Sequence, residues 1–169
     1  MMDNPSKRIA PLLDSEAAKK QVEHWQGEGL KVGFTNGCFD ILHFGHVHYL
    51  DQARDLCDRL IVALNHDASV KILKGPTRPV HDETSRATVL GALASVDMVV
   101  FFGAKEAGED NTPCALVEQL QPNLYVKGGD YKVKDLPETK IVHGYGGEVK
   151  VMSLFAGHST TNSIQKMQS

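Results

Sequence analysis

The residues best suited to chemistry lie in one short segment, Thr35-Asn36-Gly37-Cys38-Phe39-Asp40-Ile41-Leu42-His43-Phe44-Gly45-His46. A predicted strand ends here, a glycine-bearing loop follows, and a helix is expected to begin at about Gly45. Backbone N–H groups at the start of a helix are unpaired and lie at the positive end of its dipole, so they attract phosphate. His43 and His46 are three residues apart, and Gly45 between them leaves an anion free to approach both imidazoles. This pattern indicates stabilisation of charge on a phosphoryl group during its transfer.

Basic residues with neighbouring glycines form the next group of candidates. Lys74 and Arg78 flank a Gly-Pro turn, which either brings two cations over a triphosphate or forms a solvated basic loop. Lys127 ends a predicted strand, and Gly128 and Gly129 after it allow a ligand to approach the backbone closely. A phosphate held at this position is the functional interpretation.

Carboxylate and hydroxyl groups complete the set of candidates. Asp130 follows the two glycines and can accept hydrogen bonds from sugar hydroxyls. Ser159, Thr160 and Thr161 precede the last predicted helix, where their hydroxyls can cap the helix, contact phosphates, or do both.

A zinc site is disfavoured because His48 lies two residues beyond His46 and points elsewhere on a helix. No Cys or carboxylate stands at zinc-finger spacing to the three histidines. No protein ligand to a metal is therefore assigned from the pattern alone.

Short apolar segments alternate with amphipathic ones along the chain. The expected strands are 31–36, 59–65, 98–102, 123–127 and 148–154, and the expected helices are 15–28, 45–57, 82–95, 113–120, 138–145 and 160–167. Strands that are apolar at nearly every position, separated by helices, are typical of a parallel sheet covered on both faces. We therefore expect one α/β, doubly wound, Rossmann-like domain with a five-stranded parallel sheet of order 3-2-1-4-5, preceded by a loose arm over residues 1–13.

In such a sheet the ligand binds beyond the carboxyl ends of the strands, where the strand order reverses. With the expected order, this point lies between the first and fourth strands. The loops that follow these strands are residues 37–40 and 128–130, and both contain glycine and aspartate. The predicted topology thus places the candidates from the two loops at one site.

Composition limits the classes of function. The 169 residues have a formal net charge of −3, which argues against a dedicated nucleic-acid binder. The three cysteines are odd in number and form no CxxC pair, as is typical of a reduced, cytoplasmic setting. Neither a signal peptide nor an apolar run long enough to cross a bilayer is present, so no membrane association is expected.

The HxGH segment resembles the signature of the nucleotidyltransferase superfamily, which includes cytidylyltransferases and small adenylyltransferases. The similarity covers residues 30 to 168 and is closest to bacterial D-glycero-β-D-manno-heptose 1-phosphate adenylyltransferases, the ADP-heptose synthase domains. Four further stretches occur in the order expected of this family: Asn65-His66-Asp67-Ala68-Ser69, Lys74-Gly75-Pro76-Thr77-Arg78-Pro79-Val80, Val126-Lys127-Gly128-Gly129-Asp130-Tyr131 and Ser159-Thr160-Thr161-Asn162. The resemblance divides the chain into an N-terminal arm and helix, 1–29, and a nucleotidyltransferase domain, 30–169.

The resemblance implies transfer of AMP from ATP to D-glycero-β-D-manno-heptose 1-phosphate, with release of pyrophosphate and formation of ADP-heptose for lipopolysaccharide or a related glycan. It implies catalytic roles for His43, His46 and Lys74, with Lys71 as the alternative lysine. It implies nucleotide contacts for Thr35, Asn36, Gly37, Cys38, Phe39, Gly45, Arg78, Ser159, Thr160 and Thr161. It implies contacts to the sugar phosphate for Asp40, Asn65, Asp67, Arg86, Lys127, Gly128, Gly129 and Asp130, although Arg86 is equally suited to a structural ion pair.

Mg²⁺ is expected to bridge the ATP oxygens and to be held mostly by substrate and water, with Asp40 a candidate indirect ligand. Small domains of this family often pair, which predicts a homodimer.

Two other functions remain to be weighed against the adenylyltransferase. A cytidylyltransferase acting on glycerol phosphate or a similar polyol or amino-alcohol phosphate is disfavoured, because residues 155–158 are Phe-Ala-Gly-His where such enzymes usually carry an arginine and a glutamate. A non-catalytic nucleotide-binding module is the alternative of another class. An intact set of motifs without turnover on any sugar phosphate would favour it.

Overall fold

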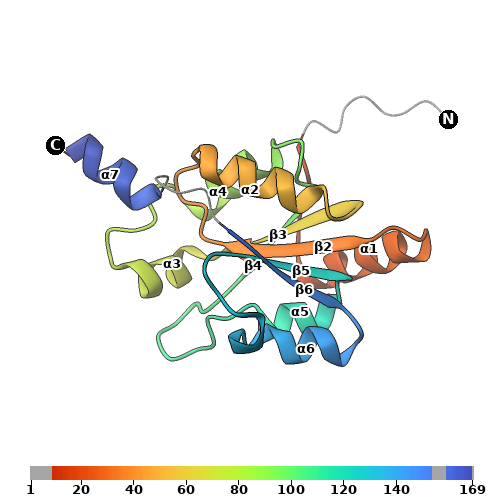
Figure 1. The fold of residues 1–169 in the computed structure, drawn as a ribbon. Helices are drawn as coiled ribbons and strands as arrows, with labels where there is room; N and C mark the ends of the chain where they lie inside the picture. Colours follow the sequence, from red (N-terminus) through yellow and green to blue (C-terminus); the bar gives the residue numbers. More distant parts are fainter. Residues whose placement is uncertain (1–8, 154–158, 169) are drawn as a thin grey trace.

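The computed structural model describes residues 9–153 and 159–168 and contains a six-stranded, all-parallel sheet (Figure 1). Along the sheet the strands follow the order β1-β4-β3-β2-β5-β6. Their bounds are β1 Leu12–Leu13, β2 Val32–Gly37, β3 Arg59–Asn65, β4 Met98–Phe102, β5 Leu124–Gly128 and β6 Glu148–Met152. The chain is therefore an α/β protein with a Rossmann-like arrangement.

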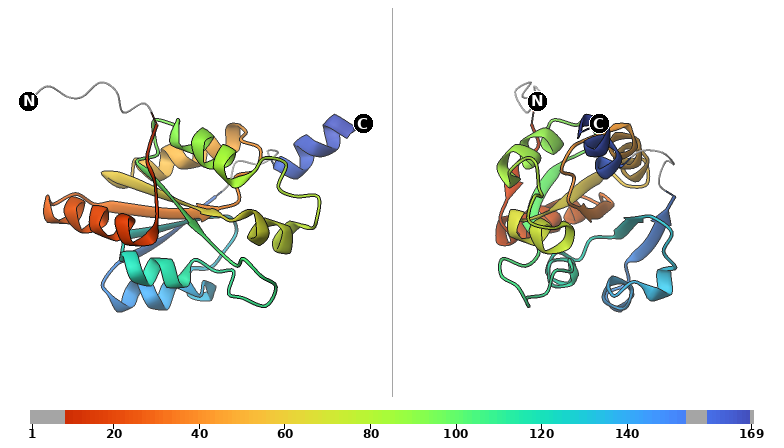
Figure 2. Two further views of the ribbon diagram at one scale, coloured as in Figure 1. Left: turned by 180° about the vertical axis from the view of Figure 1, so that it is seen from behind. Right: turned by 90° about the vertical axis from the view of Figure 1, so that its left-hand side faces the viewer.

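Helices cover both faces of this sheet (Figure 2). The helices are α1 Ser15–Gly27, α2 Phe44–Arg54, α3 Asp67–Lys74, α4 Glu83–Gly91, α5 Cys114–Leu120, α6 Glu138–Gly144 and α7 Thr160–Gln168, with a short 3₁₀ turn, η1, at Val133–Asp135. One apolar cluster joins α1, α5 and α6 to the sheet, and a second joins α2 and α4 to the opposite face. By contrast, α3 and α7 lie beyond the carboxyl edge (Figure 1).

The central strands are stabilised by buried residues, most of which are apolar. In β3, six consecutive residues from Leu60 to Asn65 are buried, and the first three residues of both β2 and β5 are buried as well. A strand enclosed on two faces has no solvent side to reserve for polar residues, so its sequence does not alternate.

The predicted order of five strands is confirmed as β4-β3-β2-β5-β6, but the prediction of a five-stranded sheet was wrong. The sixth strand, β1, pairs with β4 through Leu12 opposite Val99 and Leu13 opposite Val100. Residues 12–13 are therefore part of the sheet rather than of a loose arm. A strand of two residues carries no periodic pattern, which is why the sequence did not reveal it.

Helix α3 was also missed. Its eight residues are preceded by His66, whose side chain makes no capping hydrogen bond, and the helix ends at Gly75 with φ of 98°. Such a short helix gives a weak periodic signal. The predicted strand at 148–154 matches β6 as far as Met152, and Leu154 lies outside the described residues.

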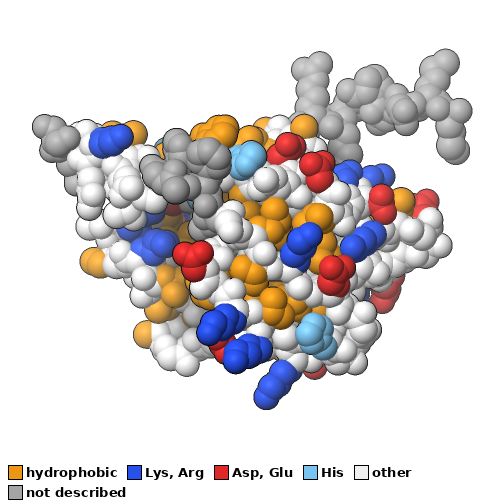
Figure 3. All heavy atoms as spheres, viewed as in Figure 1, with side chains coloured by type: hydrophobic (Ala, Val, Ile, Leu, Met, Phe, Trp, Pro, Cys, Tyr) orange, Lys and Arg blue, Asp and Glu red, His pale blue; other side chains and the backbone are white. Residues whose placement is uncertain are grey.

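At the strand-order reversal, β2 lies between β3 and β5, so the loops after β2 and β5 are neighbours at the carboxyl edge. Basic and acidic side chains are interspersed over the face drawn in Figure 3. Among the described residues, no helix combines the length and apolar character needed to cross a membrane.

Candidate active site

A cavity of about 650 Å³ opens at the carboxyl edge of the sheet, where the strand order reverses. Its walls come from the ends of β2 and β5, the first turn of α2, the end of α3, the start of α6 and the start of α7. The predicted site residues that line it are Asn36, Gly37, Cys38, Phe39, Asp40, His43, Gly45, His46, Asn65, Lys74, Arg78, Lys127, Gly128, Ser159, Thr160 and Thr161.

The loop after β2 is folded tightly around an aromatic ring. Phe39 has a φ of 42°, a left-handed conformation that is unfavourable for a residue with a bulky side chain. This conformation lays the Phe39 ring over Gly37, where an added Cβ would lie 2.8 Å from the ring. The same ring meets the imidazole of His46 edge-on, with centroids 5.1 Å apart. The strained backbone thus holds the aromatic ring against His46.

The two histidines of the HxGH segment lie side by side in the cavity wall. Their rings are stacked, with centroids 3.8 Å apart and an interplanar angle of 22°. His43 is the residue immediately before α2, and His46 lies in its first turn. Both histidines therefore belong to the start of this helix.

His46 is held in its neutral form. Burial is the main cause that lowers its pKa to about 4, and the neighbouring His43 and the charge of Lys74 act in the same direction. Hydrogen bonding to the backbone of Ile41 opposes the shift. At neutral pH, His46 is consequently a neutral group that can donate one hydrogen bond and accept another.

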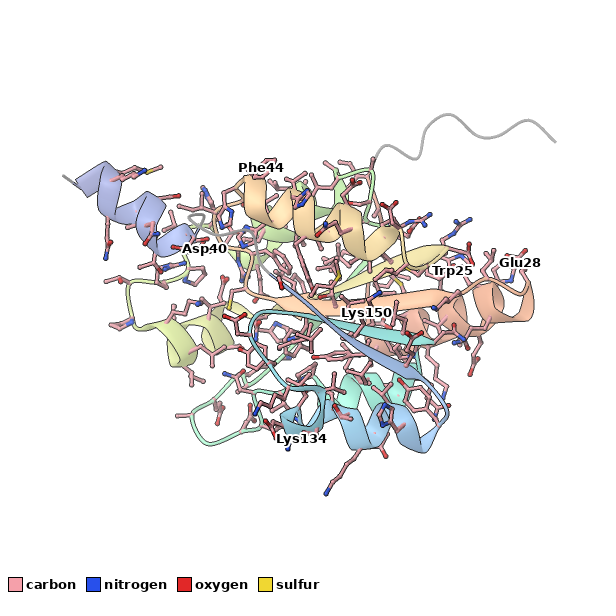
Figure 4. All side chains as sticks on the ribbon, viewed as in Figure 1. Trp25, Glu28, Asp40, Phe44, Lys134 and Lys150 are labelled. Carbon is pink, nitrogen blue, oxygen red and sulfur yellow. The ribbon has the colours of Figure 1, made fainter. Side chains whose placement is uncertain are left out.

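Asp40 fixes the loop that carries Arg78. The Asp40 carboxylate accepts hydrogen bonds from Nε of Arg78 at 2.7 Å, from N of Val80 at 2.8 Å and from N of His81 at 3.0 Å. Burial alone would raise the pKa of Asp40, but the two backbone groups and the guanidinium lower it overall. Figure 4 shows Asp40 near the start of α2. With these partners the carboxylate is engaged in positioning the loop.

Lys74 and Lys127 approach the cavity from different elements. Lys74 is the last residue of α3 and lines the cavity, whereas Lys71, which is exposed like Lys74, does not line it. Lys127 is near the end of β5, and its Nζ lies 5.7 Å from the centroid of the Tyr131 ring. The Tyr131 ring in turn packs on Gly129, whose φ of 128° and close contact leave no room for a Cβ.

Arg86 does not line the cavity but ties its loops together. The guanidinium is buried and donates to the carbonyls of Cys38 at 2.7 Å, Asn65 at 2.9 Å and His81 at 3.0 Å. It also pairs with Asp67 at 2.7 Å. The structure thus gives Arg86 and Asp67 the ion pair that the sequence left open.

Three other predicted residues also stand apart from the cavity. Thr35 is buried, and its hydroxyl shares a hydrogen bond of 2.7 Å with that of Tyr49. Gly129 and Asp130 lie in the loop after β5 without lining the cavity, and Asp130 is exposed.

The start of α7 closes one side of the site. The Ser159 Oγ accepts a hydrogen bond of 3.0 Å from N of Asn162, so this hydroxyl caps the helix. The Thr160 hydroxyl donates to the carbonyl of Ile41 at 3.1 Å, which joins α7 to the loop before the two histidines. Residues 155–158, on which the argument against a cytidylyltransferase depends, lie outside the described residues.

Several lining residues were not predicted. They are Tyr49, Leu73, Phe102, Asn111, Thr112, Pro113, Tyr131 and Glu138. Phe102 and the segment 111–113 follow β4, so extending the rule about carboxyl ends to that strand would have found them. Glu138 gave no comparable signal, because it starts a helix ten residues after β5.

The metal-ligating side chains of the described residues do not form a metal-binding cluster. Across 9–153 and 159–168, no three or more His, Cys, Asp or Glu side chains gather in a group able to hold a metal ion. The carboxylate of Asp40 already accepts three donors.

Comparisons with known proteins place the chain in a family. Residues 34–163 match the family described as Cytidylyltransferase-like. The chain is 53% identical to the Bifunctional protein HldE of Caulobacter vibrioides over 94% of this chain, and 51% identical to that of Mesorhizobium japonicum over 97% of it. In both cases the chain spans about a third of the relative's length, 32%.

Solved structures show the same fold. A lipopolysaccharide core biosynthesis protein from Thermoplasma volcanium is similar with a TM-score of 0.57 and 27% identity, over 75% of this chain and 98% of that one. A pantoate-beta-alanine ligase from Francisella tularensis shares the fold with a TM-score of 0.56 at 15% identity, over 92% of this chain and 73% of the ligase. Because the family match begins within β2 and extends into α7, enclosing the whole cavity, the chain belongs to the cytidylyltransferase-like family.

Proposed function

We propose that this chain transfers AMP from ATP to a sugar 1-phosphate, D-glycero-β-D-manno-heptose 1-phosphate, and so forms ADP-heptose and pyrophosphate. The observation that carries the proposal is the stacked pair of His43 and His46 in a cavity that Lys74, Arg78 and Lys127 also line. Similarity to the HldE proteins and to a lipopolysaccharide core biosynthesis protein supports the choice of substrate.

The reaction is an in-line displacement at phosphorus. A phosphate oxygen of the sugar 1-phosphate forms a bond to the α-phosphorus of ATP, and the bond from that phosphorus to the oxygen bridging to the β-phosphate breaks. Pyrophosphate carries away the electron pair of the broken bond. Because the attacking oxygen is already anionic, catalysis depends on positioning and on neutralising charge rather than on a general base.

The side chains divide these tasks between them. Neutral His46 donates a hydrogen bond to the oxygens around the α-phosphorus, together with His43. Lys74 and Arg78 neutralise the departing pyrophosphate, and Lys127 holds the incoming phosphate. Mg²⁺ enters with the triphosphate as part of the substrate, since it retains water and phosphate ligands readily.

The test is pyrophosphate release with ATP or CTP against a panel of sugar and polyol phosphates. We expect turnover with ATP and the heptose 1-phosphate, and a decrease of about 10²–10³ in rate for His46→Ala, the loss typical of one preorganised hydrogen-bond donor. Preference for CTP and glycerol phosphate would establish a cytidylyltransferase instead. Nucleotide binding without turnover on any acceptor would establish a non-catalytic module.

Size-exclusion chromatography with light scattering on the same preparation tests the predicted homodimer. This measurement is independent of the catalytic assay, so a monomer with full activity would overturn the prediction about assembly alone.

A further inference from the structure

Glu138 is a buried carboxylate in the wall of the cavity that the proposed chemistry does not use. It is the first residue of α6 and is only 3% exposed. Its Oε2 is buried and accepts no hydrogen bond within the described part of the chain. A buried polar atom without a partner is costly, and native proteins rarely leave one unless a ligand or water completes it.

The neighbours of Glu138 do not satisfy this carboxylate. The Tyr125 hydroxyl donates to Oδ1 of Asn36 at 2.8 Å. Burial raises the pKa of Tyr125, and the nearby negative charge of Glu138 raises it further. A phenol has a single proton and satisfies only one acceptor at a time. Oε2 of Glu138 is therefore left as a buried acceptor without a donor at this point of the wall.

A carboxylate with spare acceptor capacity selects ligands that bring O–H or N–H donors. Lys127, Tyr131 and Glu138 follow one another along the segment from β5 to α6, and all three line the cavity. A ligand whose phosphate lies at Lys127 can extend along this segment and present hydroxyl groups to Glu138. A bare divalent cation fits less well, because the described residues offer no cluster of three acidic or other ligating groups.

We infer that the Glu138 carboxylate binds hydroxyl groups of the sugar 1-phosphate and makes the site specific for a polyhydroxylated acceptor. The inference rests on the proposed function, because it places the sugar phosphate in the part of the cavity next to Lys127. It assigns the part of the cavity next to the histidine pair to the triphosphate.

The experiment compares Glu138→Gln with a matched control, Glu118→Gln, which removes the same charge from an exposed position on α5. Calorimetric titration measures the binding of the heptose 1-phosphate, of inorganic phosphate and of ATP to the wild type and to both variants. Inorganic phosphate retains the anion but lacks every sugar hydroxyl.

We expect Glu138→Gln to weaken heptose 1-phosphate binding at least about tenfold, the loss typical of a hydrogen bond to a charged group. The binding of inorganic phosphate and of ATP should remain within about twofold of wild type, and Glu118→Gln should change none of the three. In steady-state assays the KM for the sugar phosphate should rise while the KM for ATP does not.

Unchanged binding of the heptose 1-phosphate, or an equal loss for ATP, would overturn the inference; the second result would assign Glu138 to the nucleotide. A wild-type protein that binds no sugar phosphate would overturn it as well. Selective sugar binding without adenylyl transfer would contradict the proposed function only, whereas transfer that is insensitive to Glu138→Gln would contradict this inference only. Melting curves of both variants show whether the fold is retained.

Discussion

Because His46 is buried in its uncharged form, its protonation affects the stability of the whole protein. Its ring lies 3.8 Å from that of His43 and 5.1 Å from that of Phe39, measured between ring centroids, in a site also lined by Lys74. An imidazolium there would lose hydration and face a lysine ammonium. The folded protein therefore resists protonation of His46 at a pH where the unfolded chain accepts the proton readily.

Acidification should lower the stability of the folded protein, because His46 is protonated more readily in the unfolded chain. The pKa of His46 is about 4 in the folded protein and about 6.5 in an unfolded chain. The unfolded state binds more protons between these values, so stability is full above about pH 6.5 and declines as the pH falls toward 4. We expect wild type to lose about 2 kcal/mol more than His46→Gln between pH 7.5 and pH 5, measured by urea denaturation. Parallel losses in the two proteins would show that His46 titrates normally.

Among the elements, the loop after β2, the end of β3 and the loop before α4 depend on one side chain from α4. Arg86 donates to a backbone carbonyl in each of these segments, through Cys38, Asn65 and His81. The planar fork of a guanidinium suits several acceptors in fixed directions, which an ammonium does not reproduce. Loss of the fork would leave buried carbonyls without donors.

Arg86→Lys should therefore destabilise the protein by about 3 kcal/mol, in the range for disrupting a buried charged network. The measurement is the free energy of unfolding in urea. Arg59→Lys is the matched control, since Arg59 is more than a third exposed and pairs with Asp97 at 4.0 Å, and its loss should stay below about 1 kcal/mol. Equal effects of the two substitutions would refute the role assigned to Arg86.

A helix or strand could be predicted from the sequence when the features that form it lie within its own segment. The five longer strands and the helices other than α3 follow from apolar runs, periodicity and glycines, all of which a single segment contains. β1 forms because it pairs with the edge of β4, a tertiary contact that the residues of β1 alone do not indicate. The same contrast holds in the site. The HxGH loop can be recognised from its own residues, whereas Glu138 lines the cavity only because of the path that the chain takes from β5 to α6.

Across the whole molecule, the cavity joins parts that otherwise belong to separate layers. α2 packs on one face of the sheet and α6 on the other, and both contribute to the cavity, as does α7 beyond the edge. A ligand that fills the cavity contacts all of them at once. Binding should consequently stabilise the fold as a unit rather than a single loop.

ATP should raise the free energy of unfolding by about 2.7 kcal/mol when present at a hundred times its Kd, since it binds the folded state alone. Urea denaturation with and without ATP measures the gain. Lys74→Ala, which removes a cation from the cavity wall, should show a smaller gain at the same concentration. An undiminished gain in that variant would place the triphosphate away from α3.

The strained backbone at Phe39 carries a ring that serves both the core and the site. Glycine would adopt the φ of 42° at no steric cost, but it would remove a side chain that is only 7% exposed and belongs to the apolar cluster on the α2 face of the sheet. The same change would delete the ring that buttresses His46 and covers Gly37. Selection for heat resistance and selection for reaction rate would therefore both keep an aromatic ring at this position, although the backbone there is strained.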